Sequence, residues 1–434
     1  MTDAVQNATR EWTAGFRARA ARARTPIAAT LELTRRCNLR CVHCYLGDQA
    51  AQHRLKSREL AAAAMKAAIS EWSEAGCLYL TLTGGEPLLR PDFAEIYRHA
   101  RELGLVVTVF TNGTLVADEI AALFRECPPR KVEISLYGAT PETHDAVTGV
   151  PGSHARAWAG IRRLQGAGVR VVLKTVLMKP NLGEREALER QAAGIGAAFR
   201  HDAAIFPCLD GSRAPLALRI APDEAVRADM ATAERRAMWR EKIEQTAAQP
   251  PGDRLYACAA GRSAFHADPF GGFSPCLLAE HFRCESAGRP FRDVWDGDLA
   301  VLHTRQRAQR GHQRRDAGTQ QRFASCETNF AHTLRGAERG EAQDFLRAHH
   351  RGRHRLDGAE GSAVRAAEVA LLGDRDAQIA VASLMGIEQH GFVPFAHEFP
   401  FSINAMRPVR CGQDVAPMPC IASVISFPHR GASP

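Results

Sequence analysis

The stretch IAATLELTRRCNLRCVHCY, residues 27–45, decides the fold, because it runs from an apolar segment directly into three closely spaced cysteines. Five further short apolar segments follow it, and helical patterns alternate with them. This alternation is typical of a parallel sheet covered by helices. The six predicted strands are Ile27–Thr34, Leu78–Thr83, Leu105–Phe110, Lys131–Leu136, Val169–Val176 and Ala198–Phe206. Helices are predicted in every gap except the last, with apolar residues three and four apart in 59–72 and 157–164.

Small and polar residues follow the first four predicted strands. The segments are RRCNLRCVHC after the first strand, GGEP after the second, TNG after the third and YGAT after the fourth. In parallel α/β folds the ligand binds at the carboxyl ends of the strands. The sequence therefore predicts a ligand site built from these four loops.

The three cysteines of the first loop have the spacing CxxxCxxC, at Cys37, Cys41 and Cys44. Thiolates are soft ligands that favour iron–sulfur clusters or zinc. Three ligands leave one iron of a four-iron cluster open to a small molecule, whereas a structural zinc site needs a fourth ligand such as His43. Spacing alone favours the cluster and leaves zinc as the alternative.

The pair LTRRCNLRCVHCY and LTLTGGEPLLRPDF resembles the radical S-adenosylmethionine (SAM) superfamily. The resemblance covers about residues 27–210 and implies an α/β fold, a partial (β/α)6 barrel. It implies that Cys37, Cys41 and Cys44 ligate a 4Fe-4S cluster whose fourth iron binds SAM. The SAM contacts it implies are His43, Gly84, Gly85, Glu86, Asn112 and Ser135. A tight turn before a helix is the other interpretation of GGEP.

The same resemblance implies an enzyme in which one electron from the cluster cleaves SAM to methionine and a 5′-deoxyadenosyl radical, which removes hydrogen from the substrate. It implies a reductant such as flavodoxin or ferredoxin. Candidates for a catalytic acid or base are Asp202 and Asp210, which flank the sixth predicted strand. An aspartate beside Gly211 is also a common turn former.

The chain divides into five predicted parts. These are an N-terminal extension (1–26), the radical SAM core (27–215), a helical linker (216–250), a small cysteine-containing domain (251–300) and an irregular basic tail (301–434). CAAGRSAFHADPFGGFSPC, from Cys258 to Cys276, resembles the start of a SPASM domain, which implies that these two cysteines ligate an auxiliary 4Fe-4S cluster. Only Cys326, Cys411 and Cys420 follow beyond residue 300, without the spacing of that family, so the domain is interpreted as partial or divergent.

The basic charge of the chain is concentrated in its last part. The whole chain has a formal charge of +8, and residues 301–358 hold 12 arginines, no lysine and 6 acidic residues. Periodic apolar residues are sparse there, which indicates either a disordered basic linker or a shift of reading frame. Because aromatic residues are not interleaved with these charges, nucleic acid is not an expected partner.

The composition predicts a cytoplasmic protein, and the family resemblance implies that it acts on a peptide. The chain has 434 residues, 45% of them hydrophobic, and its apolar stretches are too short for a membrane span. SLYGATPETHDAVTGVPGS and FRHDAAIFPCLDG resemble enzymes of pyrroloquinoline quinone biosynthesis and peptide maturases. Since only 26 residues precede the first strand, a separate carrier protein is expected to present the peptide. The alternatives are an enzyme of small-molecule cofactor biosynthesis and an inactive protein that binds SAM and a cluster.

Overall fold

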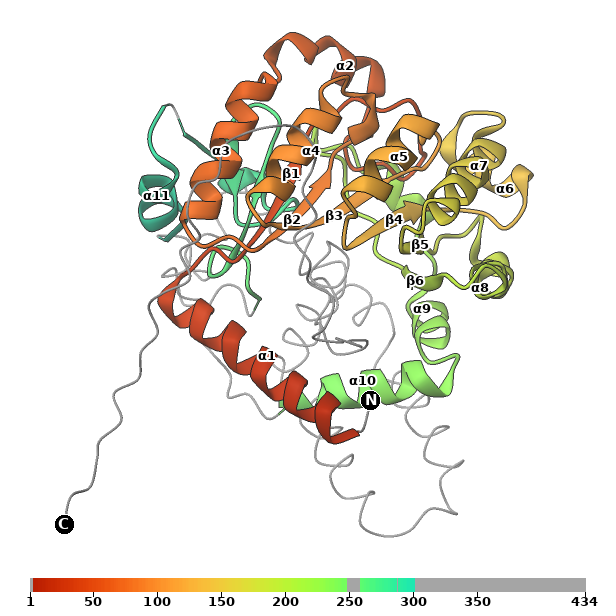
Figure 1. Cartoon of the computed structure of the whole chain (residues 1–434). Helices are drawn as coiled ribbons and strands as arrows, with labels where there is room; N and C mark the ends of the chain where they lie inside the picture. The colour runs from red at the N-terminus through yellow and green to blue at the C-terminus, as the bar shows by residue number, and fades with distance from the viewer. Residues whose placement is uncertain (1–2, 248–257, 287, 301–434) are drawn as a thin grey trace, which may run out of the picture. The chain divides into compact units, whose positions relative to one another are not determined.

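The computed structural model describes residues 3–247, 258–286 and 288–300 (Figure 1). Its six predicted strands are all present: β1 (Ala28–Glu32), β2 (Tyr79–Thr83), β3 (Val106–Thr111), β4 (Lys131–Ser135), β5 (Val171–Val176) and β6 (Ala198–Asp202). The main helices are α1 (Asp3–Ala23), α2 (Gln49–Arg54), α3 (Ala62–Glu74), α4 (Phe93–Glu102), α5 (Asp118–Glu126), α6 (Pro141–Thr148), α7 (Ser153–Gly166), α8 (Arg185–Gly194), α9 (Pro222–Asp229) and α10 (Ala233–Ala247).

The six strands form a parallel sheet in the order β6-β5-β4-β3-β2-β1. Each strand pairs with the strand before it in sequence, so that Thr30 of β1 lies beside Thr81 of β2 and Ser135 of β4 beside Lys174 of β5. All six carboxyl ends therefore meet at one edge of the sheet. The predicted partial (β/α)6 barrel is confirmed.

Amphipathic helices cover the outer face of this sheet, as Figure 1 shows for α3, α4, α5 and α7. In α3 the residues Met65, Ile69 and Trp72 are buried, and they recur three and four positions apart. They belong to one continuous apolar core with strand residues such as Leu80 and Val107. Burial of this core stabilises the sheet and fixes which side of each strand faces the barrel interior.

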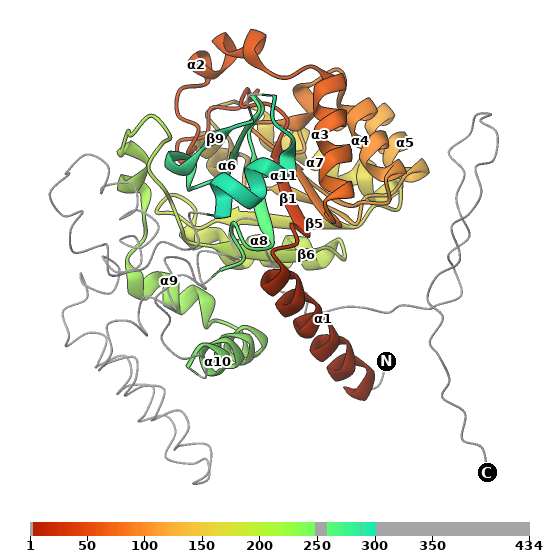
Figure 2. The ribbon, with the colours of Figure 1, turned by 90° about the vertical axis from the view of Figure 1, so that its left-hand side faces the viewer.

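The segment after the gap at 248–257 adds to the same sheet. It contains β7 (Ala264–Ala267), β8 (Gly272–Ser274), β9 (Cys284–Glu285) and α11 (Phe291–Asp293), which continues into a π-helical turn, Val294–Asp298. Strand β7 pairs in parallel with β1, and β8 and β9 follow it antiparallel, so the segment lies beside β1 (Figure 2). Phe265, Phe291 and Trp295 belong to the barrel core. The described part of the predicted small domain, 251–300, therefore shares its sheet and core with the barrel.

Three other features differ from the sequence-based expectation or extend it. The gap between β5 and β6, for which the pattern indicates no clear helix, holds α8. Strand β6 ends at Asp202, four residues before the predicted end, because the chain leaves the sheet to cross beneath the cysteine loop. The predicted linker is helical as α9 and α10. No helix among the described residues is long and apolar enough to cross a membrane, and the predicted tail at 301–434 lies outside the described residues.

Candidate active site

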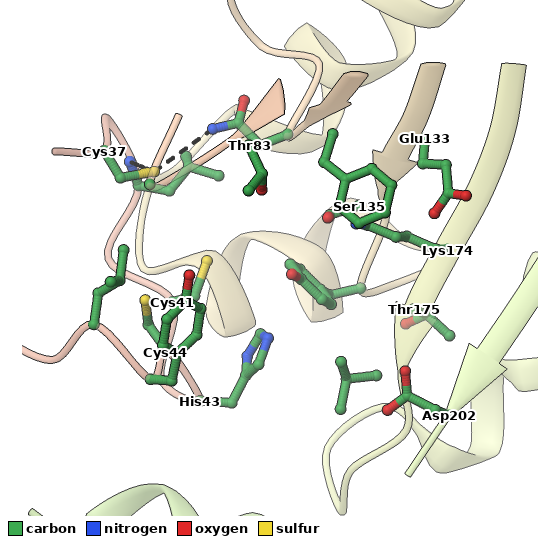
Figure 3. A pocket seen from close by; sticks show the side chains of 18 of the residues that line it. Cys37, Cys41, His43, Cys44, Thr83, Glu133, Ser135, Lys174, Thr175 and Asp202 are labelled. Carbon is green, nitrogen blue, oxygen red and sulfur yellow. Dashed lines mark hydrogen bonds between the residues drawn. The ribbon is translucent and has the colours of Figure 1, made fainter. Parts of the chain in front are cut away.

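A cavity of about 230 Å³ lies at the carboxyl ends of the parallel strands. Figure 3 shows Cys41, His43 and Cys44 on one side of it and Lys174, Thr175 and Asp202 on the other. The predicted site residues that line it are Cys37, Cys41, His43, Cys44, Gly84, Gly85, Asn112, Ser135 and Asp202. Seven of them come from the first three loops selected by sequence, and Tyr137 of the fourth loop also lines the cavity, so the fold brings these loops around one cavity.

The cysteine loop is fixed by hydrogen bonds to three other parts of the chain. The amide of Cys37 donates to the side-chain oxygen of Gln49 at 2.7 Å. The amide of Val42 donates to the carbonyl of Val147 at 2.9 Å, and Tyr45 accepts from the amide of Leu209 at 2.8 Å. Because α2, α6 and the segment after β6 all hold the loop, its three thiols face the cavity.

The donor set fits a 4Fe-4S cluster. The Sγ atom of Cys37 accepts from the Leu39 amide at 3.4 Å and from Nδ2 of Asn112 at 3.7 Å, contacts that stabilise a cluster-bound thiolate. Burial and the neighbouring Cys44 and Cys37 thiols raise the pKa of Cys41 well above its ordinary value, so a metal charge is needed to make it a thiolate. Within the described ranges, no group of three or more His, Cys, Asp or Glu side chains surrounds a position for a metal ion.

The two glycines of GGEP bring the second loop against the cysteine loop. A Cβ atom on Gly84 would lie 2.1 Å from the carbonyl oxygen of Thr34, and one on Gly85 would lie 2.3 Å from that of Arg36. Gly84 also has φ +141°, a conformation that other residues rarely adopt. The amide of Gly85 donates to the Thr34 carbonyl at 2.7 Å. Only glycine permits this approach, which leaves the backbone of both residues open to the cavity.

Glu86 is placed differently from the other motif residues, because its carboxylate does not line the cavity. It is fully buried and accepts hydrogen bonds from the Leu88 amide (3.1 Å), the Thr111 hydroxyl (2.7 Å) and the Asn112 amide (2.7 Å). Its side chain thus joins the loops after β2 and β3 and places Asn112 in the cavity. The Asn112 side chain donates to Asn38 of the cysteine loop at 2.9 Å.

His43 and Ser135 lie in the cavity wall. The ring of His43 meets that of Tyr137 edge to face, with the centroids 4.5 Å apart. Its Nδ1 atom is buried and has no hydrogen-bond partner among the described residues, and burial lowers the pKa of His43 to about 4. The contact of His43 with the adenine of SAM stays a prediction.

The structure places the two aspartate candidates in different surroundings. Asp202 ends β6 in the cavity wall, and burial raises its pKa to about 6. Asp210 lies outside the cavity in a turn, where it accepts from the Ser212 amide at 2.8 Å and the following Gly211 has φ +90°. Asp210 therefore forms a turn outside the cavity, and its role as a catalytic acid or base stays a prediction.

Charged residues on the inner face of β4, β5 and β6 were missed by sequence reasoning. Glu133, Lys174 and Arg200 line the cavity below Ser135 and Asp202. Each is two residues before another cavity residue on its own strand, so the period-two alternation of strands could have identified them. They make the interior of this barrel a charged one.

Cys258 and Cys276 lie close enough for the Cys258 thiol to contribute to the raised pKa of Cys276, about 12, which is caused mainly by burial. Leu277, next to Cys276, lines the cavity. Two thiols are half of the ligand set of a 4Fe-4S cluster. Cys284 is apart from this pair, with its Sγ atom donating to the Phe273 carbonyl.

Comparison with known proteins shows which family and which relatives the core of the chain is similar to. A model of the "Radical SAM superfamily" matches residues 31–192. The "AdoMet-dependent heme synthase" of Methanosarcina barkeri is 39% identical over 170 residues, which are 39% of this chain and 48% of that protein. The "PqqA peptide cyclase" of Ruegeria pomeroyi is 30% identical over 278 residues, 62% of this chain and 74% of that protein. The chain thus spans about half the length of the former relative and three quarters of the latter.

A solved structure has the same fold. Streptococcus suis SuiB bound to S-adenosylmethionine superposes with a TM-score of 0.52 and 14% sequence identity, over 67% of this chain and 70% of that one. At this identity the likeness concerns the fold alone. It agrees with the partial barrel described above and extends past the family match at 31–192.

Proposed function

The chain belongs to the radical SAM superfamily, and on this premise we propose that it is an oxidoreductase or maturase that cleaves SAM reductively and modifies a peptide. The observation that carries the proposal is the common cavity of the three thiols and the open Gly84–Gly85 backbone. A bound 4Fe-4S cluster would supply one electron to SAM, which yields the 5′-deoxyadenosyl radical for hydrogen abstraction. The reductant would be a flavodoxin or ferredoxin, and the location the cytoplasm.

In this proposal the protein residues bind and orient. Cys37, Cys41 and Cys44 hold the cluster, and Asn112 donates toward the Cys37 sulfur. The Gly84–Gly85 backbone holds the amino group of SAM, with Glu86 fixing the loop from behind. His43 and Ser135 contact the adenosine part from the opposite wall. Because side chains of six strands surround the cavity, water is largely excluded from the reacting atoms.

A peptide substrate is supported by the extent of the match to the PqqA peptide cyclase, which runs beyond the barrel into the following segment. We infer that a separate carrier protein presents the peptide. The Cys258–Cys276 pair would contribute to an auxiliary 4Fe-4S cluster, completed by ligands from elsewhere in the chain.

A small-molecule substrate is the second candidate, because the heme synthase of Methanosarcina barkeri is more identical in the core. That match spans 170 residues of alignment, whereas the cyclase match spans 278. An iron tetrapyrrole would then be the substrate class. The third alternative is a protein that binds SAM and a cluster without turnover.

The first experiment measures iron and sulfide, the electron paramagnetic resonance spectrum and SAM cleavage on the full chain after anaerobic reconstitution. We expect about four irons at the barrel site, a spectrum changed by SAM, and methionine with 5′-deoxyadenosine after reduction by dithionite. Cys41→Ala should lose the SAM-sensitive signal. The matched control is Cys77→Ala, since Cys77 is a buried thiol at the opposite end of β2. Zinc in place of iron, or a signal that survives Cys41→Ala, would refute the proposal.

The second experiment separates the substrate classes. The reconstituted protein is incubated with SAM, reductant and either a PqqA-type peptide with a carrier protein or Fe-coproporphyrin III. Faster deoxyadenosine release with a mass change in the peptide supports the maturase, and a change in the tetrapyrrole supports the second candidate. Cluster and SAM binding without cleavage under any of these conditions would support the inactive protein.

A further inference from the structure

One cation in the cavity is left without a counterion. Lys174 projects from β5 into the cavity, and its Nζ atom lies 3.3 Å from the centroid of the Phe110 ring. In the part of the chain that the structure describes, this ammonium group makes no hydrogen bond and no ion pair. A buried ammonium group normally has three hydrogen bonds to satisfy.

The nearest carboxylate is already taken by other cations. Glu133, one strand away on β4 and almost fully buried, accepts from Lys131 at 2.6 Å. Arg200 of β6 donates to both Glu133 oxygens at 3.2 Å. Glu133 therefore already pairs with Lys131 and Arg200, and within the described residues it makes no ion pair with Lys174.

The electrostatics of the cavity agree with this geometry. Burial lowers the pKa of Lys174 to about 8, with Glu133 acting in the opposite direction. Burial also raises the pKa of Asp202, across the cavity, to about 6. The charged side chains that line the cavity are Lys174, Arg200, Glu133 and Asp202; of the two cations, Arg200 pairs with Glu133, whereas Lys174 makes no ion pair with a described residue.

We propose that Lys174 binds a carboxylate group of the substrate, with the face of Phe110 and the Glu133–Arg200 pair holding the ammonium group in place. This inference rests on the proposed function and makes Lys174 a residue that determines specificity. A peptide could supply the carboxylate from an acidic side chain or its C-terminus, and a tetrapyrrole from a propionate.

SAM brings a carboxylate of its own, and the geometry argues against it as the ligand of Lys174. The methionine part of SAM is expected beside Cys37 and the Gly84–Gly85 backbone. Figure 3 shows Lys174 on the other side of the cavity, with Glu133, Thr175 and Asp202. The space next to Lys174 is therefore left for the substrate.

The test uses the full chain with its cluster, saturated with SAM, and two probes of which only the first has a carboxylate, N-acetyl-L-glutamate α-amide and N-acetyl-L-glutamine α-amide. Affinities are measured by calorimetry for the wild type, Lys174→Met, Lys174→Arg and the control Lys66→Met, a half-buried lysine of α3 that pairs with Glu95 and does not line the cavity. We expect the wild type and Lys66→Met to bind the glutamate probe at least tenfold more tightly than the glutamine probe. Lys174→Met should abolish that preference, and Lys174→Arg should keep most of it.

SAM affinity and reductive SAM cleavage without substrate are measured on the same preparations. We expect both to be within threefold of the wild type in Lys174→Met, because the residue acts on the substrate. Failure of SAM cleavage in the wild type would refute the proposed function and leave the probe result to be judged separately. Equal or undetectable binding of the two probes by the wild type would overturn the inference. So would a tenfold loss of SAM affinity in Lys174→Met, which would assign the lysine to the SAM carboxylate.

Discussion

Replacing Gly85 by alanine should damage the cavity through a steric effect alone. The added Cβ atom would lie 2.3 Å from the carbonyl oxygen of Arg36 and 2.6 Å from that of Arg35. Ordinary contact begins at 3.4 Å, so one of the two loops has to move by about 1 Å. Gly85 is not in the left-handed region, unlike Gly84, so the substitution adds no backbone strain of that kind.

This movement would lower both the stability of the protein and the rate of SAM cleavage. Overpacking of this kind costs about 1–3 kcal/mol in free energy of unfolding. The shift also weakens the 2.7 Å hydrogen bond from the Gly85 amide to the carbonyl of Thr34, which is three residues before Cys37. Since a displacement of about 1 Å at a reacting centre lowers rates by about 100-fold, we expect SAM cleavage to fall by about that factor.

The assay combines urea unfolding with iron content and deoxyadenosine release from the reconstituted protein. The control is Gly166→Ala at the end of α7, where an added Cβ atom meets nothing within 4 Å. The control should keep full activity and gain up to about 1 kcal/mol of stability. A Gly85→Ala protein with wild-type stability, iron content and cleavage rate would show that the close approach of the two loops is not required.

Three further predictions concern the surroundings of the site. Tyr45→Phe removes a 2.7 Å hydrogen bond to the fully buried Glu32 and should cost about 1.5–3 kcal/mol in urea unfolding; an unchanged midpoint would contradict this role. Because the folded pKa of Asp202, about 6, lies above its unfolded value, its contribution to stability is lost as pH rises from about 4 through 6. Wild type should therefore lose up to about 2 kcal/mol more than Asp202→Asn between pH 5 and pH 8 in urea unfolding, and equal losses would exclude the shift. Asn112→Ala removes a donor to the Cys37 sulfur and should lower the reduction potential of the cluster in an EPR-monitored titration, with no change expected if the contact is incidental.

Local sequence patterns predicted the barrel and much of the site. The six strands are confirmed, because alternating apolar and helical segments have few ways to bury their apolar faces other than a helix-covered parallel sheet. The cysteines at 37, 41 and 44 and the glycines at 84 and 85 lie in loops directly after strands. Their convergence on one cavity follows from the parallel direction of those strands.

Residues whose role depends on contacts between distant segments were not predictable in this way. Glu86 belongs to the sequence motif, yet its carboxylate binds Thr111 and Asn112 and leaves the cavity to the glycines. Asp202 and Asp210 both flank the sixth predicted strand. In the structure Asp202 lies in the cavity wall, whereas Asp210 lies in the turn before Gly211. The orientation of a single side chain depends on which donors other segments supply, and a local pattern does not record them.

The sequence by itself determined the succession of strands along the chain, the cysteine loop and the family, since these depend on periodicity and on spacing within a few residues. The tertiary structure alone decided that β7 extends the sheet beside β1 and that Glu133, Lys174 and Arg200 meet inside the barrel. Period-two alternation shows which residues of a strand share a face, but the curvature of the whole sheet decides which face is the interior. For that reason, only the folded barrel shows that Lys174 points into the interior and makes no ion pair with a described residue.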